Sequence, residues 1–155
     1  MYRASETAPV SPASVHTVVE MLRVAKLTRQ YMQLAVWEAG LHAGQDELLD
    51  VLADTPLSFS AVADQVGIRS ATLSKMIDRM VEKGLVERVK SLDDRRKMDV
   101  VLTPEGAEVQ RLVRAIWERT EREVFGELSS SEIQQTLESL TTLHSQLKVR
   151  LRRLR

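Results

Sequence analysis

Cysteine is absent from the 155 residues of this chain, and only three histidines are present. A chain without cysteine has no disulfide, no thiolate zinc site, no iron–sulfur cluster and no thiol-based redox switch. Aromatic residues make up 4% of the chain, too few for a platform that stacks single-stranded nucleic acid. No apolar run approaches the roughly 18 residues of a transmembrane helix, and the start of the chain lacks the apolar stretch of a signal peptide. We therefore expect a cytoplasmic protein with no membrane partner, no metal site and no cofactor.

Charge is balanced overall but unevenly distributed along the chain. The 22 basic and 22 acidic residues cancel, so the net charge favours no nucleic-acid partner. Between Arg69 and Lys97, however, nine basic residues accompany only five acidic ones, and the last eight residues contain five basic groups and no acid. The electrostatic field of a local cluster of charges matters more for binding than the net charge of the whole chain does. The middle segment is a candidate surface for an anionic partner, whereas the C-terminal charges either contact DNA or complement a helix dipole.

Apolar residues recur with helical spacing in six segments, and 43% of the chain is apolar, enough for a core. Ser14 stands where an N-cap would precede the first segment, and Ser129 with Glu132 forms a capping-box pattern before the last. Thr103 followed by Pro104 is typical of the start of another helix. The predicted helices cover residues 15–39, 45–53, 59–66 and 70–83, with the fifth beginning after Thr103 and the sixth at Ser129.

A β-hairpin is predicted after the fourth helix, because the apolar period changes there from 3.6 to about 2. Leu85–Lys90 and Met98–Leu102 are the expected strands, joined by a charged turn over Ser91–Arg96, and Leu57–Ser58 is a short extended pair. Two helices joined at Gly67 and followed by a basic hairpin form a winged helix-turn-helix. The predicted fold class is therefore mainly α with a small β-hairpin wing. In this layout the second helix enters the major groove of DNA, and the wing reaches the backbone or minor groove.

The fourth predicted helix divides into an apolar face and a polar face. Leu73, Ile77, Met80 and Val81 are expected to pack inward. Short hydroxyl side chains near the helix start let the backbone approach base edges, and long cationic side chains further along reach guanine or phosphate. The predicted DNA-contacting residues of this helix are Ser70, Thr72, Ser74, Lys75 and Arg79.

The middle of the chain contains a set of motifs at a defined spacing: Ala63–Ile68, Ser70–Ser74, Ile77–Arg88, and Asp94-Arg95-Arg96 followed by Val100–Thr103 and Gly106. With these motifs at this spacing, the middle of the chain resembles the MarR family of transcriptional regulators. The resemblance implies a homodimeric repressor of nearby genes that a small phenolic or anionic ligand releases from DNA. It also implies roles for the wing residues: Arg96 enters the minor groove, Asp94 braces it, and Arg95 and Lys97 flank the phosphates. A guanidinium is attracted to the negative potential of a narrow minor groove, which supports the same assignment.

The first and last helices carry more apolar surface than one small winged lobe can cover. Val18 and Leu22 belong to the broad apolar set of the first helix, and the last has a leucine seam containing Leu140, Leu143, Leu147 and Leu151. Large exposed apolar patches are rare on monomers, so we expect a homodimer bound to an inverted-repeat operator. We therefore predict a flexible tail over residues 1–13 and a single domain over residues 14–155. Within that domain, 57–104 is the DNA-binding lobe, and 14–40 and 105–155 are dimerisation helices.

The sequence departs from the family pattern before the second helix, where His42 replaces a capping hydroxyl. The effector cleft is expected where the first, second and fifth helices meet the winged lobe, with Trp37, His42 and Arg88 as suggested lining residues. A winged-helix module that binds protein instead of DNA remains an alternative. An enzyme is not expected, because no catalytic triad, paired carboxylates, phosphate loop or metal cluster is apparent.

Overall fold

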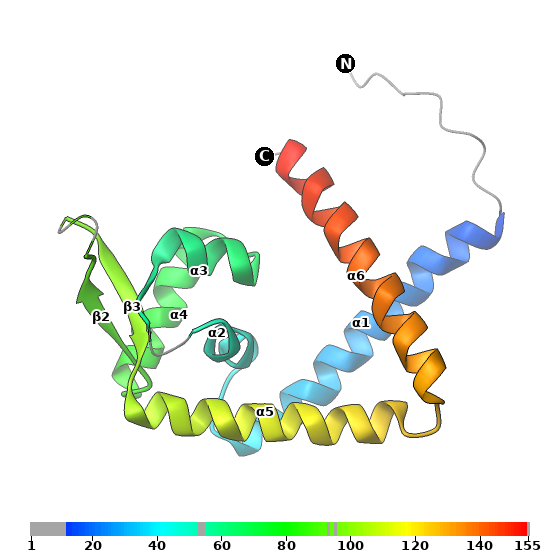
Figure 1. Cartoon of the computed structure of the whole chain (residues 1–155), viewed down its shortest axis with the longest axis horizontal. Helices are drawn as coiled ribbons and strands as arrows, with labels where there is room; N and C mark the ends of the chain where they lie inside the picture. The colour runs from blue at the N-terminus through cyan, green and yellow to red at the C-terminus, as the bar shows by residue number, and fades with distance from the viewer. Residues whose placement is uncertain (1–11, 53–54, 93, 95, 155) are drawn as a thin grey trace. The chain divides into compact units, whose positions relative to one another are not determined.

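The computed structural model describes residues 12–52, 55–92, 94 and 96–154. By their contacts, the described residues fall into two compact units that divide between Ile116 and Trp117, inside one long helix. The elements in chain order are α1 (Pro12–Glu38), α2 (Gln45–Val51), β1 (Leu57–Ser58), α3 (Phe59–Val66), α4 (Ser70–Glu82), β2 (Val86–Lys90), β3 (Met98–Leu102), α5 (Pro104–Phe125) and α6 (Ser130–Arg153) (Figure 1). The predicted class, mainly helical with a small β wing, is confirmed.

The wing is the larger part of a three-stranded antiparallel sheet with the order β1-β3-β2. β2 and β3 form the predicted hairpin, in which Arg88 lies opposite Val100 and Lys90 opposite Met98. The short strand β1 pairs with the other edge of β3, with Leu57 opposite Val100. The sequence predicted that Leu57–Ser58 is extended. It did not predict that β3 is the pairing partner, because about forty residues separate the two strands. The sheet thereby attaches the wing to the beginning of α3.

The core of the first unit is built from one face of each short helix. Leu48, Leu49 and Leu52 of the α2 region are fully buried. On α4, Leu73, Ile77 and Met80 are also fully buried, at the spacing of one helical face. Val81 was predicted to join them, but this prediction is wrong because its side chain is 38% exposed. One residue beyond Met80 in the helix, it lies at the edge of the apolar face.

Local capping determines where several helices begin. Ser58 caps α3 by accepting a hydrogen bond from the backbone N–H of Ala61 at 3.2 Å. The predicted cap at Ser14 is wrong, because α1 already begins at Pro12, and proline suits the first position of a helix. Two residues assigned to the tail thus belong to α1, and the remaining eleven lie outside the described part of the chain.

The segment in which His42 replaces a hydroxyl nevertheless starts α2 at the predicted residue, Gln45. Gly44 precedes it with φ of 84°, a left-handed conformation that glycine adopts without strain. The Gln45 side chain reaches back and accepts a hydrogen bond from the backbone N–H of His42 at 2.9 Å, and Asp46 accepts one from Gly44 at 3.1 Å. Side chains of the first helical turn therefore hold the preceding segment in place, and the helix starts without a side-chain cap.

The junction between the wing and α5 depends on a threonine and a glycine. The Thr103 hydroxyl donates to the Gly84 carbonyl at 2.6 Å and accepts from the backbone N–H of Gly106 at 2.9 Å. A Cβ atom on Gly106 would overlap the carbonyl oxygen of Leu85. Only glycine therefore lets α5 approach the turn before β2 this closely, which explains why threonine and glycine stand three residues apart here.

The second unit contains the end of α5 and all of α6. Ser129 caps α6 in a full capping box, since its hydroxyl accepts from the Glu132 N–H and the Glu132 carboxylate accepts from the Ser129 N–H, as predicted. These bonds from Ser129 hold the pKa of Glu132 below its ordinary value. Along this single chain the predicted leucine seam is exposed, with Leu140 at 50% and Leu147 at 45%.

Candidate nucleic-acid interface

The exposed side of α4 carries the residues that the sequence placed there. Ser70, Thr72, Lys75 and Arg79 are exposed, and Ser74 is half-buried. No acidic residue lies in the first turn of the helix. The positive end of the helix dipole, hydroxyl groups and two cationic side chains therefore share one surface, which suits a polyanion.

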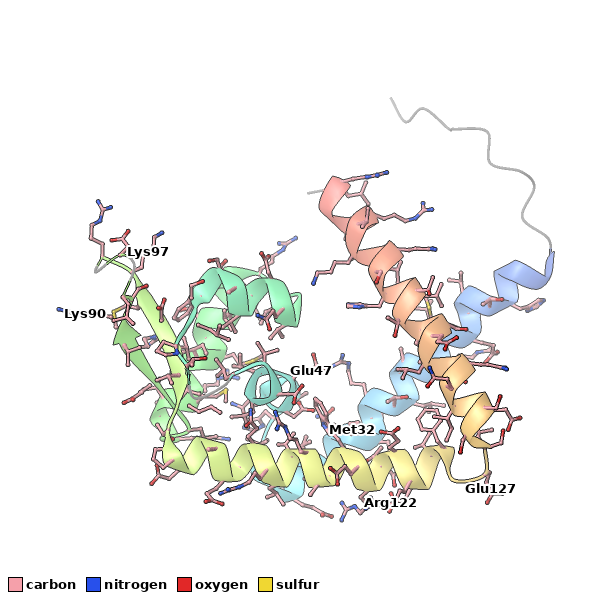
Figure 2. All side chains as sticks on the ribbon, viewed as in Figure 1. Met32, Glu47, Lys90, Lys97, Arg122 and Glu127 are labelled. Atoms are coloured by element: carbon pink, nitrogen blue, oxygen red, sulfur yellow. The ribbon has the colours of Figure 1, made fainter. Side chains whose placement is uncertain are left out.

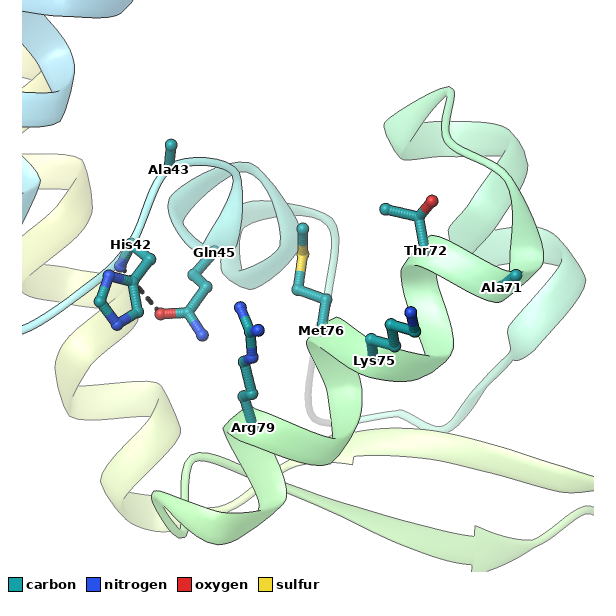
Figure 3. A pocket seen from close by; sticks show the side chains of 8 residues that line it. All are labelled: His42, Ala43, Gln45, Ala71, Thr72, Lys75, Met76 and Arg79. Atoms are coloured by element: carbon teal, nitrogen blue, oxygen red, sulfur yellow. Dashed lines mark hydrogen bonds between the residues drawn. The ribbon is translucent and has the colours of Figure 1, made fainter.

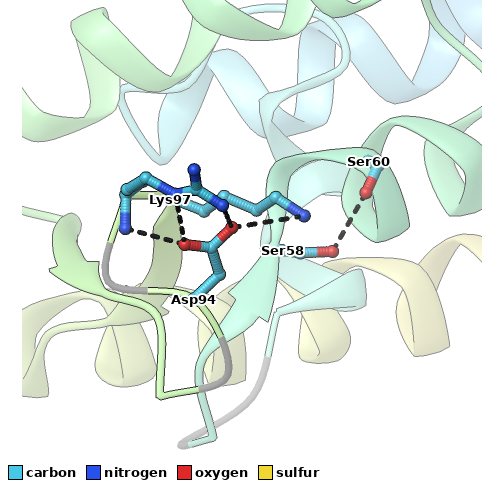
Figure 4. Close-up of polar contacts among 5 residues, drawn as sticks. Ser58, Ser60, Asp94 and Lys97 are labelled. Carbon is cyan, nitrogen blue, oxygen red and sulfur yellow. Dashed lines mark hydrogen bonds and ion pairs between the residues drawn. The ribbon is translucent and has the colours of Figure 1, made fainter.

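The wing holds one arginine in a fixed orientation at its tip. The Arg96 side chain is 90% exposed, while the Asp94 carboxylate beside it is only 27% exposed. Asp94 accepts bonds from the backbone N–H and the Nε of Arg96 at 3.0 and 3.2 Å, and Nη2 lies 3.5 Å from its second oxygen (Figure 4). The side-chain and backbone bonds from Arg96, aided by the charge of Lys97, hold the pKa of Asp94 below its ordinary value. The carboxylate thus stays ionised and orients the guanidinium toward solvent.

Further cations surround this pair. The Lys97 ammonium lies 3.9 Å from the second Asp94 oxygen, and Lys90 and Lys97 both lie near the end of the hairpin (Figure 2). Backbone bonds close the turn, from the Lys97 N–H to the Asp94 carbonyl at 2.8 Å and from the Ser91 N–H to the Lys97 carbonyl at 3.1 Å. Arg95, the remaining predicted wing contact, lies outside the described residues. The described wing tip is therefore positively charged and geometrically constrained.

A hollow of about 270 Å³ lies beside α4, between that helix and the segment leading into α2 (Figure 3). His42 and Gln45 line one side, and Thr72, Lys75 and Arg79 line the other. Ala43, Ala71 and Met76 complete the lining. The hollow therefore shares three side chains with the DNA-contacting face predicted for α4.

The three suggested effector residues are not brought together in this hollow. His42 lines it, but Trp37 and Arg88 do not. Trp37 is 67% exposed near the end of α1. Arg88 is engaged elsewhere: its Nη2 lies 2.5 Å from an Asp78 oxygen, and its guanidinium carbon lies 5.6 Å from the centre of the Phe59 ring. A pattern search along the sequence cannot find such a contact, because its three members lie on three different elements.

Sequence reasoning also missed Gln110, whose side-chain amide donates to the carbonyls of Leu49 and Leu52 at 2.5 and 2.7 Å. These bonds satisfy carbonyl groups at the end of α2, which a helix leaves without internal partners. Arg114, one turn further on α5, lies 3.5 Å from Asp50 of α2. Two polar contacts thus connect α5 to α2, the helix next to the hollow.

Other kinds of site are not indicated by the described residues. Within them, no group of three or more histidine, aspartate or glutamate side chains is arranged to hold a metal ion. Over the same part of the chain, no helix combines the length and the apolar character needed to cross a membrane. The cationic surface of α4 and the wing is therefore the candidate interface.

A family model described as MarR family matches residues 48–98, the segment from α2 into the wing. The chain is 33% identical over 99 residues to the transcriptional regulator HosA of Escherichia coli O127:H6, an alignment covering 57% of this chain and 73% of HosA. The chain belongs to the MarR family. It is also 25% identical over 118 residues to the homoprotocatechuate degradative operon repressor of Escherichia coli, covering 76% of this chain and 80% of that protein.

A further relative of this MarR-family chain is a putative transcriptional regulatory protein for the hcr operon of Thauera aromatica, 29% identical over 105 residues. That alignment covers 67% of this chain and 63% of the relative, so the chain spans less than two thirds of the length of that protein. The family and its fold are those of transcriptional regulators, which are not enzymes.

Solved structures of MarR-family regulators share the fold. AbsC from Streptomyces coelicolor superposes with a TM-score of 0.79 at 23% identity, covering 92% of this chain and 99% of AbsC. Staphylococcus aureus MarR, solved with salicylate and kanamycin, gives 0.77 at 19% identity, covering 88% and 93%. A complex of S. aureus MepR with DNA gives 0.72 at 19% identity, covering 82% and 93%. At these identities the likeness concerns the fold of the MarR-family chain.

Proposed function

We propose that this transcriptional regulator is a homodimeric repressor that binds an inverted-repeat operator in double-stranded DNA and is released by a small anionic ligand. The observation that carries the proposal is the pairing of a cationic α4 surface with a wing whose exposed Arg96 is oriented by Asp94. The MepR–DNA complex and the name of the homoprotocatechuate operon repressor support DNA binding and repression by analogy.

The proposed DNA contacts follow from the reach of each side chain. Ser70, Thr72 and Ser74 bring the start of α4 close to base edges in the major groove, and Lys75 and Arg79 reach guanine acceptors or phosphates. Arg96 enters the minor groove, where a narrow groove concentrates negative potential. Arg95 and Lys97 contact the flanking phosphates. Asp94 contacts no DNA and acts by holding Arg96 in place.

The homodimer is proposed because long apolar rows remain uncovered on α1 and α6 of one chain. Val18 and Leu22 of α1 are 55% and 62% exposed, and Leu143 and Leu151 of α6 are 38% and 54% exposed. Together with Leu140 and Leu147, these side chains are the proposed dimer contacts. A second copy of the chain would remove them from water, and a two-fold pair places two α4 helices one DNA turn, about 34 Å, apart.

The hollow beside α4 is the proposed effector site. Lys75 and Arg79 line it together with His42, so it favours an anionic ligand. Salicylate, an aromatic carboxylate, was bound in the S. aureus MarR structure, and p-coumaroyl-CoA in that of Rhodococcus jostii CouR, which supports this class of ligand by analogy. A ligand releases DNA only if it binds the DNA-free form more tightly. A ligand in the hollow would contact side chains that also contact DNA, so its affinity for the DNA-free form would be higher.

Selection of bound duplexes from a random pool tests the proposal and yields the operator. The retained sequences should contain an inverted repeat, and log affinity should fall with log salt by about 0.9 for each phosphate neutralised. Arg96→Ala should weaken binding to the selected duplex about tenfold or more, because a positioned arginine contact is lost.

Arg111→Ala is the matched control, since Arg111 is an exposed arginine on α5 paired with Glu108 outside the wing. It should bind like the wild type, and both variants should melt at wild-type temperature by circular dichroism. A protein that retains no duplex in dilute buffer would contradict DNA binding. Equal affinities of the Arg96→Ala and Arg111→Ala variants would remove the wing from the proposed interface.

A further inference from the structure

Arg88 is the point at which three elements of the winged lobe meet. It lies on β2, but its guanidinium pairs with Asp78 of α4 at 2.5 Å and lies over the ring of Phe59, the first residue of α3, at 5.6 Å. Its side chain is 31% exposed, compared with 90% for Arg96 at the wing tip. Arg88 therefore contacts the two helices of the helix-turn-helix rather than extending from the surface.

Asp78 is the carboxylate that forms an ion pair with Arg88. It is the first carboxylate along α4, and no other precedes Glu82. Helical spacing places it next to Ser74 and Lys75, four and three residues earlier, on the side of α4 proposed to face DNA. An unpaired carboxylate there would repel phosphate and attract the Lys75 ammonium. Arg88 supplies the opposite charge from the wing side.

We propose that Arg88 is a positioning residue for DNA binding, which neutralises Asp78 and ties α4 to the wing strand β2. This inference rests on the proposed function and assigns Arg88 and Asp78 a joint role within it. The planar guanidinium suits both contacts at once, because it can pair with a carboxylate along its edge while its face lies on an aromatic ring. Since Arg88 connects both helices to β2, the angle between α4 and the wing depends on it.

The test is a double-mutant cycle in the full-length protein, with Arg88→Met, Asp78→Asn and the double variant titrated against the selected duplex by fluorescence anisotropy. Methionine keeps an unbranched apolar side chain over Phe59 but removes the charge. We expect Arg88→Met to bind about tenfold more weakly and Asp78→Asn to stay within about threefold of wild type, as a direct pair interaction predicts. In the Arg88→Met background, Asp78→Asn should recover about fivefold or more, because it removes the uncompensated carboxylate.

Glu82→Gln is the matched control, since Glu82 is an exposed carboxylate one turn further along α4 and has no ion pair among the described residues. Its effect should be the same with or without Arg88. An Asp78→Asn effect that is also independent of Arg88 would overturn the proposal, and so would wild-type affinity of Arg88→Met. A loss of stability alone would not produce recovery by Asp78→Asn at temperatures where all four proteins are folded.

Should Arg88→Met fail to fold, the same cycle is run with Arg88→Gln, and the same non-additivity is expected.

Two further outcomes separate the role of Arg88 from the proposed function. A wild-type protein that retains no duplex overturns both proposals. Wild-type binding combined with an additive cycle overturns only the role of Arg88.

Discussion

At the scale of single residues, Asp94 is the carboxylate whose ionisation the wing depends on. The side-chain and backbone bonds from Arg96 lower its pKa below the ordinary value. A carboxyl group with a lowered folded pKa contributes its interaction above the unfolded pKa and loses it as the pH falls through the folded pKa. The brace on Arg96 is therefore complete at neutral pH and is lost only in acid.

Carboxyl-carbon NMR of the free protein measures this directly. The Asp94 carboxyl should titrate at a lower pH than in an unfolded peptide, and Arg96→Ala should move the midpoint back toward the ordinary value. Lys97→Ala should move it less, because the Lys97 charge is the smaller cause of the shift. If Arg96→Ala leaves the midpoint where it was, the two side chains are not paired in solution.

Gly106 is a position at which packing and helix propensity oppose each other. Alanine is the better helix former by about 1 kcal/mol, so Gly106→Ala would stabilise an isolated helix. In the folded chain the new methyl group would overlap the Leu85 carbonyl oxygen, which belongs to backbone and cannot rotate away. We expect the clash to dominate and to lower the free energy of unfolding by about 1–3 kcal/mol.

Urea denaturation of Gly106→Ala against wild type measures this change. Glu105→Ala serves as the control, because Glu105 is exposed beside it on α5 and its replacement should stay within about 0.5 kcal/mol. A more stable Gly106→Ala variant would show that propensity dominates and that α5 moves freely away from Leu85.

At the scale of elements, α2 depends on a side chain from far along the chain. It has seven residues, too few to be stable alone in water. Its buried leucines and the two bonds from Gln110 to its last carbonyls supply the missing stability. Sequence periodicity predicted a helix here, but Gln110 lies about sixty residues away along the chain, and no local pattern connects it to α2.

Gln110→Ala should lower the free energy of unfolding by about 1–3 kcal/mol, because half-buried carbonyl groups lose their partners. Gln135→Ala on α6 is the control, since its side chain is exposed, and it should change stability little. Chemical denaturation measures both. Hydrogen exchange should also accelerate at the end of α2 in Gln110→Ala, and unchanged exchange there would contradict the capping role.

At the scale of the whole molecule, the exposed apolar rows of α1 and α6 are the proposed dimer contact. Leu140 and Leu147 lie seven residues apart on α6, on one face of the helix. Replacing both with lysine places two like charges in the proposed dimer contact of each chain. The variant should therefore dissociate to a mass near 17.5 kDa, while the wild type should have about twice that mass.

Light scattering after size exclusion measures the mass. The charge-matched control is Thr142→Lys with Ser145→Lys, on the opposite face of α6, which should remain dimeric. A dimeric Leu140→Lys/Leu147→Lys protein would place the interface elsewhere on the chain. A monomeric wild type would contradict the proposed homodimer.

Most of the helices and the hairpin could be predicted from the sequence, because they depend on interactions between near neighbours. Helical and alternating apolar periods predicted the helices and the hairpin, capping patterns predicted the start of α6, and Asp94 and Arg96 lie two residues apart. The contacts between distant groups are visible in the folded chain alone: β1 with β3, Gln110 with the end of α2, and Arg88 with Asp78 and Phe59. Such contacts join residues that lie far apart in the sequence, so no local pattern predicts them. They form only when a shared core brings their elements together.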